Sequence, residues 1–487
     1  MDLVEMIVAN LTAFSCIGED PRGGFTRLGY SHVEDQMHGL ASYLMERAGL
    51  STEKDAACNL VGTKHQGHGR NVMFGTHLDS VICGGNYDGI VGFISALEAI
   101  RHAEMQRMEE DGTEDPFGCG IETRIFRAEE STAYGRACLG SSAGFGFLPV
   151  EEKKRLTRRS DIDHPGERLY DSIRRNDGDP DIEQTIEPEK YSCYIEVHIE
   201  QSNVLEKEDI PIGIVTSIRA PVRHRITLSG QDSLYAASDM ILLLEDLAQT
   251  YSGSGIDMVA TVGKAEGGFE GALNPNTIPG TIGVQLSAAP GMDLSSIEAS
   301  RGIRCEYQDD KLIVYGRKDH SGATPMGNRI DALAGACQVI RNLPSYAVPN
   351  VDSISFFSDI RSNDFGGRDR LEQEYLHRCH DIASAMGLGF SADELERSAP
   401  QRLDPAMGQV MALSADEIGI PYILMPSGAG HDALKSAQAG IPTVMLFCPS
   451  IGGISHDWKE LSRPEDIAYA SQIVSHFLRH YAKDFCS

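Results

Sequence analysis

The stretch NVMFGTHLDSVICGGNYDGIVGFISALEAIRHAEM, Asn71–Met105, contains a strand pattern, a Gly-rich turn and a helix pattern in direct succession. The apolar run Val72–Phe74 leads into His77 and Asp79, and Asp88 follows in a turn flanked by glycines. After the turn, apolar residues recur at the spacing of an amphipathic helix. A strand followed directly by a helix is the repeating unit of an α/β domain. The stretch therefore predicts an α/β fold and places ionisable side chains where a buried strand ends.

The same alternation of strand and helix patterns returns on both sides of a middle region. Further strand patterns lie at residues 122–131 (ETRIFRAEES), 191–202 (YSCYIEVHIEQS), 421–433 (PYILMPSGAGHDA) and 441–450 (IPTVMLFCPS). Strands that alternate with helices indicate a mainly parallel central sheet flanked by helices. A chain of 487 residues exceeds what one ordinary core holds. We expect residues 1–210 and 397–487 to form the α/β domain together, with a second region between them.

The middle region, residues 211–396, contains a segment that occurs twice. Gly230–Met240 reads GQDSLYAASDM and Gly316–Met326 reads GRKDHSGATPM, and three of the eleven positions are identical. Each segment follows an apolar strand pattern and precedes a helical run, which adds weight to the match. This pattern favours two copies, 211–300 and 301–396. The alternatives are chance similarity and a single copy that carries a long insertion.

Composition and charge limit the classes of partner. The formal net charge of −28 at pH 7 repels nucleic acid and anionic membranes. No apolar stretch reaches the roughly 18 residues of a membrane span, and the N-terminal MDLVEMIVANLTAF has acidic residues where a signal peptide has basic ones. The 11 cysteines include no C-x-x-C pair, which argues against a thiolate zinc site. We therefore expect a cytoplasmic protein with neither nucleic acid nor membrane as a partner.

Ionisable side chains gather at the ends of the predicted strands. In an open α/β sheet, ligands bind beyond the carboxyl ends of the strands. The side chains at such positions are His77, Asp79, Asp88, Glu129, Glu130, His198 and His456. Imidazole and carboxylate groups without thiolates suit a pair of zinc-like or manganese-like divalent ions.

The carboxylates of this set have specific chemical roles open to them. Asp88 is the natural bridge between two cations about 3.5 to 4 Å apart. Glu129 and Glu130 repel each other unless a cation neutralises one, so one can bind a metal while the other acts as a base. Asp79 follows His77 closely enough to fix the tautomer of its ring. Taken singly, each residue also fits an ordinary surface, core or turn position, but their joint occurrence at strand ends favours a metal site.

Six motifs, in this order, resemble those of a known family: GTHLDSVICGGNYDG, FRAEESTAYGRACLGS, EVHIEQSNVLE, NTIPG, MPSGAGHDA and PSIGGISH. The family is the N-carbamoyl-L-amino-acid hydrolase, allantoate amidohydrolase and β-ureidopropionase group of the di-metal aminoacylase/carboxypeptidase superfamily. The resemblance extends over about residues 20–470. It implies a catalytic domain with an inserted α+β, ferredoxin-like lid, two divalent metal ions (zinc, manganese or cobalt), a small-molecule substrate and a homodimer.

The resemblance also implies a role for each candidate residue. One metal lies among His77, Asp88 and His198, and the other among Asp88, Glu130 and His456. The remaining catalytic positions are Glu129 as general base, Asp79, and His320 as the residue that polarises the scissile carbonyl. The substrate-binding positions are Gln201, Asn276, Arg361 and His431. Family members hold a substrate carboxylate with the Asn and the Arg, which suits the planar fork of guanidinium.

The middle region departs from the family pattern. The segment NTIPGTIGVQLSAAP carries no Arg, and SISFFSDIRS with Arg361 follows about 80 residues later. The loop His of the family falls at Leu234 in the first repeated segment and at His320 in the second. The lid therefore looks doubled. A second copy in the same chain would take the place of a partner's lid and supply His320 in cis, which predicts a monomer instead of a homodimer.

The residues and the resemblance together predict a hydrolase of linear, non-peptide amides of carbamoyl, ureido or N-acyl type on a small carboxylate-bearing substrate. Metal-bound hydroxide attacks the carbonyl, and Glu129 transfers the proton. An aminoacylase or dipeptidase is the alternative, because the same centre cleaves ordinary amide bonds. A second alternative is not an enzyme at all: a metal-free binding protein that retains the fold.

Overall fold

The structure, a computed structural model, describes residues 2–64, 69–110, 117–159, 162–272, 277–287, 292–344 and 346–486. The chain forms two compact units. Unit 1 contains Met1–Ile218 and Gln401–Ser487, and unit 2 contains Arg219–Pro400.

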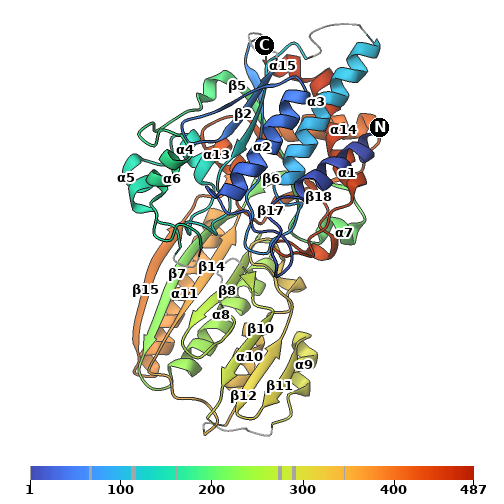
Figure 1. The fold of residues 1–487 in the computed structure, drawn as a ribbon. Coiled ribbons are helices and arrows are strands. Elements are labelled where there is room, and N and C mark those ends of the chain that lie inside the picture. The colour runs from blue at the N-terminus through green and yellow to red at the C-terminus, as the bar shows by residue number, and fades with distance from the viewer. Residues whose placement is uncertain are drawn as a thin grey trace. The chain divides into compact units, whose positions relative to one another are not determined.

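A nine-stranded sheet forms the centre of unit 1 (Figure 1). Its strands are β1 (Ser51–Lys54), β2 (Leu60–Lys64), β3 (Asn71–His77), β4 (Ile121–Phe126), β5 (Tyr191–Ile199), β6 (Ile212–Ile218), β16 (Gln401–Arg402), β17 (Tyr422–Ser427) and β18 (Thr443–Cys448). The order is β1-β2-β4-β3-β5-β18-β6-β16, and β17 also pairs with β6. The central strands β4, β3, β5 and β18 run parallel to one another. The mainly parallel central sheet expected from the sequence is confirmed.

The fold-deciding stretch forms β3, a turn and α3 (Ile90–Glu110). Along β3, Val72 and Phe74 face one apolar core and Met73 faces a second core on the other side of the sheet. Side chains alternate between the two faces of a strand, so a strand covered on both faces is apolar throughout. This explains the continuous apolar run and leaves polar groups for the end of the strand.

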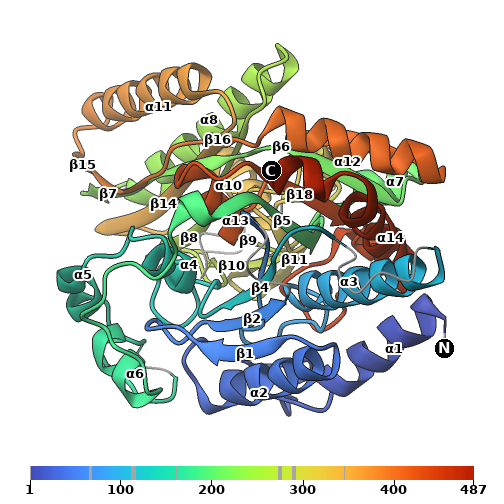
Figure 2. The same cartoon turned by 90° about the horizontal axis from the view of Figure 1, so that it is seen from above.

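Helices cover this sheet on both faces (Figure 2). Besides α3, they are α1 (Leu3–Phe14), α2 (His32–Arg47), α4 (Leu139–Gly144), α5 (Val150–Arg155), α6 (Leu169–Arg175), α7 (Val204–Glu208), α12 (Pro405–Ile418), α13 (Asp432–Gln438), α14 (Pro464–His480) and α15 (Ala482–Cys486), with 3-10 turns η1 (Pro188–Lys190) and η3 (Ile451–Gly453). Helices α1, α3 and α14 pack side by side over one face. Among the described segments, no helix combines the length and the apolar character needed to span a membrane.

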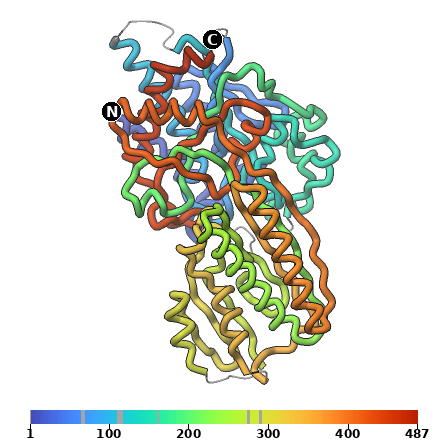
Figure 3. The backbone as a smooth tube through the Cα atoms, turned by 180° about the vertical axis from the view of Figure 1, so that it is seen from behind, coloured from blue at the N-terminus to red at the C-terminus, as the bar shows by residue number. Residues whose placement is uncertain are grey.

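Unit 2 contains a four-stranded antiparallel sheet with two long helices against it. Its elements are β7 (Ala220–Ser229), α8 (Ser233–Gly253), β8 (Val259–Glu266), β14 (Ser353–Ser362), α11 (Phe365–Ala385) and β15 (Gly389–Arg397). The strand order is β15-β7-β14-β8. Helices α8 and α11 lie side by side (Figure 3). The β-α-β-β-α-β succession is that of a ferredoxin-like fold.

The chain between β8 and β14 forms a smaller sheet. Its elements are β9 (Thr277–Ile278), β10 (Thr281–Gln285), α9 (Ser295–Arg301), β11 (Arg304–Gln308), β12 (Lys311–Tyr315), β13 (Asp319–His320), η2 (Met326–Asn328) and α10 (Ala332–Asn342). The order β10-β12-β11 is antiparallel, and β13 pairs with β9.

The strand pairing in unit 2 differs from two copies divided between residues 300 and 301. The larger sheet takes β7 and β8 from the expected first copy and β14 and β15 from the second. The smaller sheet nevertheless repeats the arrangement of three strands of the larger one. In the smaller sheet β12 lies between β10 and β11, and in the larger sheet β7 lies between β14 and β15. The topology fits either one ferredoxin-like unit with a long insertion or two copies that have exchanged their second halves. The duplication is thus not confirmed and stays a prediction.

The outer limits of the middle region also differ slightly from 211 and 396. Strand β6 falls inside the expected first copy, yet it pairs with β17 and β18 and belongs to the sheet of unit 1. Its apolar pattern carries no sign of which partner strand it meets, because strand pairing is set by distant parts of the chain.

We predict that Gly75→Ala destabilises unit 1. A Cβ at Gly75 would lie 2.0 Å from the hydroxyl of Tyr194, whose side chain is fully buried and cannot move away. Overpacking of this kind costs up to about 3 kcal/mol, so the thermal unfolding temperature should fall. The matched control is Gly39→Ala in α2, where a Cβ meets nothing within 4 Å and gains up to about 1 kcal/mol of helix propensity. Equal unfolding temperatures for the two variants would contradict the packing argument.

Candidate metal centre

The carboxyl edge of the parallel strands in unit 1 brings distant parts of the chain together. His77 ends β3, Glu129 and Glu130 follow β4, His198 lies near the end of β5, and His456 follows β18. Asp88 lies in the turn before α3. All are buried except His456, which is half-buried. Neighbouring parallel strands end at the same edge, which is why these side chains can meet.

The first cluster consists of His77, Asp88 and His198. Nε2 of His198 lies 3.0 Å from Oδ1 of Asp88, and Nε2 of His77 lies 3.5 Å from the same oxygen. The two Nε2 atoms are 3.4 Å apart. These three atoms therefore point at one small volume.

The second cluster consists of Asp88, Glu130 and His456. Nε2 of His456 lies 3.3 Å from Oδ2 of Asp88 and 3.0 Å from Oε1 of Glu130. The two clusters share Asp88, one carboxylate oxygen serving each. The structure thus brings together all five side chains that the resemblance implies as metal ligands, in the two groups it implies.

The donor set fits two cations. Nδ1 of His77 lies 3.2 Å from the carbonyl oxygen of Asp79, and Nδ1 of His198 lies 2.9 Å from the carbonyl oxygen of Ile199. A carbonyl only accepts, so each Nδ1 carries the proton and each neutral ring presents a lone pair at Nε2. Those lone pairs face Oδ1 of Asp88, which is buried and receives no hydrogen bond from the described residues. Lone pairs that converge in a buried site need positive charge between them.

Without an ion, protons on the imidazoles would supply this positive charge: burial lowers the pKa of His77, His198 and His456, but the neighbouring carboxylates outweigh it and raise the pKa of each ring. Burial opposes ionisation of Asp88, but His198, His456 and His77 outweigh it and hold the pKa of Asp88 well below its ordinary value. Glu129 behaves in the opposite way, because burial and the neighbouring Glu130 raise its pKa well above the ordinary value despite His77. One carboxylate therefore stays ionised and the other holds a proton readily.

Asp79 supports both glutamates through their backbone. Its Oδ1 accepts from the N–H of Glu129 at 3.0 Å, and its Oδ2 accepts from the N–H of Glu130 at 3.1 Å. Its Oδ1 also lies 3.4 Å from Nδ1 of His77. Asp79 therefore ties the end of β3 to the turn after β4. Cys138 donates from its thiol to Oε1 of Glu129 at 3.3 Å.

The backbone around the centre is tightly constrained. Ala128, Gln201 and His456 adopt left-handed conformations, with φ of 51°, 57° and 57°. Such conformations in residues other than glycine cost energy and concentrate at functional sites. At Gly89 (φ 69°), a Cβ would lie 2.5 Å from the carbonyl oxygen of His77, so only glycine fits behind this ligand.

Two of the expected substrate-binding residues lie beside the candidate metal ligands. Nε2 of Gln201 donates to Oδ2 of Asp88 at 2.9 Å and lies 3.4 Å from Nε2 of His456. The ring of His431 lies 4.5 Å from the ring of His198, and its Nε2 is 2.9 Å from Oγ of Ser427. Both side chains are buried. Gln201 thus orients the shared carboxylate, whatever else it contacts.

The expected catalytic residue His320 and the other expected substrate-binding residues belong to unit 2. His320 is buried, and its Nδ1 accepts from the N–H of Ala323 at 3.0 Å. Arg361 on β14 donates from Nε and Nη2 to Asp359, at 3.0 and 2.9 Å, and Nη2 lies 3.4 Å from Oγ of Ser321. The structure therefore brings Arg361 to the segment that carries His320. Asn276 lies outside the described residues.

Glu460 is a supporting residue that the sequence argument missed. Its Oε1 accepts from the N–H groups of Tyr87 and Asp88 at 3.0 and 2.9 Å, and its Oε2 accepts from the N–H of His456 at 3.3 Å. One buried carboxylate therefore joins the two segments that carry Asp88 and His456. The acid four residues after His456 in SHDWKE was the available signal.

Further buried acids surround the centre. Glu34 accepts from the N–H of Ala128 at 3.0 Å and pairs with Arg127 at 2.8 Å, which fixes the turn before Glu129. Glu196 lies two residues before His198 on β5, so it points to the same face. Glu196 groups with His198 and His431 as a third cluster of possible ligands.

These features define an α/β protein whose candidate centre is typical of two-metal hydrolases. The chain belongs to Peptidase family M20/M25/M40, whose model matches residues 121–480. The family resemblance read from the motifs is thereby confirmed.

Curated relatives align over nearly the whole chain. An N-carbamoyl-L-amino acid amidohydrolase of Geobacillus stearothermophilus is 28% identical over 469 residues, 94% of each chain. An allantoate deiminase of Arabidopsis thaliana is 27% identical over 462 residues, 89% of this chain and 74% of the relative. A solved amidase of the hydantoinase/carbamoylase family from Burkholderia multivorans shares the fold, with a TM-score of 0.72 at 22% identity, covering 98% of this chain and 97% of that chain.

We predict that Glu460→Gln weakens metal binding about 10- to 100-fold, as loss of a residue that orients ligands does. The amide NH2 that replaces one oxygen would face the N–H of His456 or those of Tyr87 and Asp88, and two donors repel. Competition with a chelator, followed by metal analysis, measures the change. Glu465→Gln, an exposed acid nearby on α14, is the control. Unchanged affinity in a folded Glu460→Gln protein would show that Glu460 does not position the ligands.

Proposed function

We propose that the protein is a metal-dependent amidohydrolase that cleaves a linear amide of carbamoyl, ureido or N-acyl type in a small carboxylate-bearing molecule. The observation that carries the proposal is the pair of clusters that share Asp88, with Glu129 beside them. Membership of the peptidase family supports hydrolysis. The names of the relatives, which include an N-carbamoyl-L-amino acid amidohydrolase and an allantoate deiminase, support the class of bond.

Two divalent ions, zinc, manganese or cobalt, are the proposed cofactors. His77, Asp88 and His198 would hold one, and Asp88, Glu130 and His456 the other. When bound, such ions polarise a carbonyl and lower the pKa of a water molecule toward neutrality.

Glu129 is the proposed general base. It is buried, lies next to a ligand, and receives a hydrogen bond from Cys138. Its raised pKa suits a group that takes a proton from the attacking water and delivers it to the leaving nitrogen. Asp79 holds the N–H groups of Glu129 and Glu130 and so keeps base and ligand in place.

The proposed roles of the unit 2 residues follow from their hydrogen bonds. His320 accepts at Nδ1, so its neutral ring carries the proton at Nε2 and can donate to a carbonyl oxygen. Asn276 and Arg361 are proposed to hold the substrate carboxylate. Asp359 accepts from Nε and Nη2 of Arg361 and so orients the guanidinium.

We predict that Glu129→Gln lowers kcat about 10²- to 10⁴-fold, because the proton loses its carrier, while both metals stay bound. The assay offers N-carbamoyl, ureido and N-acyl acids to protein loaded with zinc, manganese or cobalt, and measures ammonia and free amine separately. Ammonia from N-carbamoyl substrates supports the proposal, whereas amine from N-acyl substrates alone indicates an aminoacylase or dipeptidase.

The control for this assay is Glu151→Gln, whose side chain is 85% exposed. A chelator should abolish the activity of both the wild type and this control, and the metals should restore it. Hydrolysis by Glu129→Gln at the wild-type rate would remove Glu129 from the mechanism. Absence of hydrolysis from every metal-loaded wild-type sample would favour a binding protein.

We also propose that His320 acts within its own chain, so that the protein is a monomer. The smaller sheet of unit 2, which leads into His320, repeats the arrangement of three strands of the larger sheet and supports a second lid copy in the chain.

The prediction is a monomeric mass of about 53.0 kDa by light scattering. A mixture of Glu129→Ala chains and His320→Ala chains should then regain no activity, because each chain lacks one catalytic residue and a monomer cannot receive it from a partner. A stable dimer whose mixed variants recover activity would contradict the monomer.

A further inference from the structure

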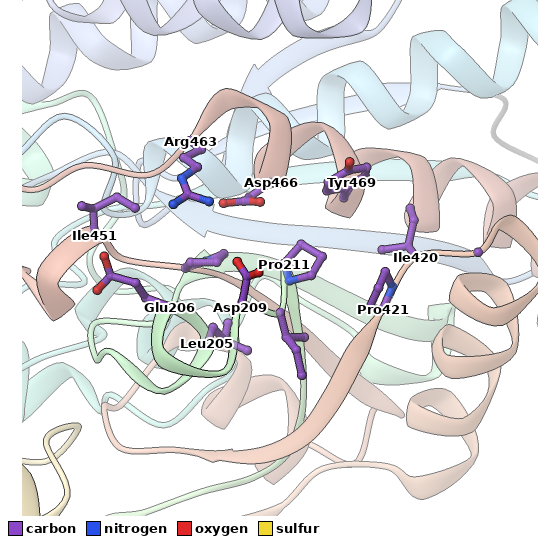
Figure 4. A pocket seen from close by; sticks show the side chains of 13 residues that line it. Leu205, Glu206, Asp209, Pro211, Ile420, Pro421, Ile451, Arg463, Asp466 and Tyr469 are labelled. Atoms are coloured by element: carbon purple, nitrogen blue, oxygen red, sulfur yellow. The ribbon is translucent and has the colours of Figure 1, made fainter.

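A cavity of about 290 Å³ opens in unit 1 between the segment around α7 and the start of α14 (Figure 4). None of the candidate metal ligands lines it. Its size is at the small end of cavities that bind small molecules. It therefore suits a ligand of few atoms.

One wall carries two charged groups at the start of α14. Asp466 is only 6% exposed, and its Oδ2 is buried without a hydrogen-bond partner among the described residues. Burial raises the pKa of Asp466 to about 6, so the carboxylate is ionised at neutral pH. An unpartnered buried carboxylate is costly unless a donor reaches it. The guanidinium of Arg463 extends toward the cavity beside it (Figure 4) and forms no close ion pair within the described chain.

The opposite wall is acidic. Glu206 on α7 and Asp209 directly after it extend toward Arg463 from the other side (Figure 4). Oε2 of Glu206 accepts from the N–H of Gly452 at 2.8 Å, which fixes its direction. Three carboxylates therefore surround a space that has one guanidinium, and the excess negative charge favours a ligand with an ammonium group.

The rest of the lining is apolar. Ile420, Pro421 and Ile451 contribute side chains, as Figure 4 shows. A ligand that satisfies all these surfaces has an ammonium group, a carboxylate and a short aliphatic body. Guanidinium binds carboxylates through charge-assisted hydrogen bonds, and the carboxylates accept from ammonium.

We propose that this cavity is a binding site for a small α-amino acid with an aliphatic side chain. Its ammonium group donates to Asp466 and the acidic wall, its carboxylate accepts from Arg463, and its side chain packs on the isoleucines. An amino acid of this kind is also a product expected from the proposed function, but the contacts that would bind it in this cavity do not depend on that function.

The walls of this cavity continue into the candidate metal centre. Helix α7 begins three residues after Gln201, and η3 leads from Ile451 toward His456. The N–H of Gln201 donates to Oγ of Ser450 at 3.1 Å, which joins the two segments. A bound amino acid thus contacts segments that carry residues of the centre.

Calorimetric titration of the purified protein with L-leucine tests the proposal. We expect Arg463→Gln and Asp466→Asn each to weaken binding at least about 10-fold, or roughly 1.4 kcal/mol. Compounds that lack one charged group, 3-methylbutylamine and 4-methylpentanoate, should bind the wild type at least about 10-fold more weakly than leucine. Glu465→Gln, which removes an exposed charge on the same turn without lining the cavity, should bind leucine as the wild type does.

The outcomes separate this site from the metal centre. Thermal unfolding at the wild-type temperature shows that the variants fold, and exposed Arg463 offers a variant with little structural risk. Leucine binding that survives both substitutions, or disappears only with a chelator, belongs to the metal centre and overturns the proposal. No measurable heat at millimolar leucine overturns it as well. Because no hydrolysis is measured, failure of the proposed function would leave this result unaffected.

Discussion

Mutual repulsion between buried carboxylates is the constraint on which the centre of unit 1 depends. Asp79, Glu460 and Glu34 each accept backbone N–H groups, and Glu34 also pairs with Arg127. Oδ1 of Asp88 receives no such donor within the described chain and faces only imidazole nitrogens. The acids thus fall into two sets: one set accepts hydrogen bonds from the backbone, and the other consists of the candidate metal ligands. Burial raises the pKa of Glu34 and of Glu460 to about 7, and the backbone donors offset part of this rise without competing for a metal.

The supporting acids also explain how four of the five distant segments hold one geometry. Asp79 joins the end of β3 to the turn after β4, and Glu460 joins the turn before α3 to the segment after β18. The bonds from Glu130 to Asp79 and from Asp88 to Glu460 join residues far apart in sequence, and each of these bonds starts at the backbone N–H of a candidate ligand. These bonds fix the backbone, and therefore the Cα positions, of the candidate ligands. The parallel sheet supports the same segments rigidly.

The side chains that meet in the two clusters could be predicted from the sequence because a position at the end of a strand pattern and a match to a family motif coincide there. His77 lies at the end of the apolar run of β3, and His198 lies near the end of β5, where a buried strand meets the edge of the sheet. Glu460 gave no comparable signal, since an acid in a polar loop is ordinary and its importance lies in three N–H groups that only folding brings together. The family motif predicts a substrate-binding role for Gln201, whereas its bond to Asp88 and its left-handed backbone are features that sequence patterns do not show.

Unit 2 marks the limit of sequence reasoning more sharply. The repeat around Gly230 and Gly316 was visible, as were the strand and helix beside each copy, because these are local features. The sequence does not show which strands pair. Strands β10 and β14 are both apolar, so either could lie beside β7 or β12. Exchange of halves between two similar copies keeps every local contact and changes only the connections, so it costs little in packing energy. A lid built from exchanged halves would also tether its two sheets through two chain crossings instead of one, which restricts independent movement of the segment that carries His320.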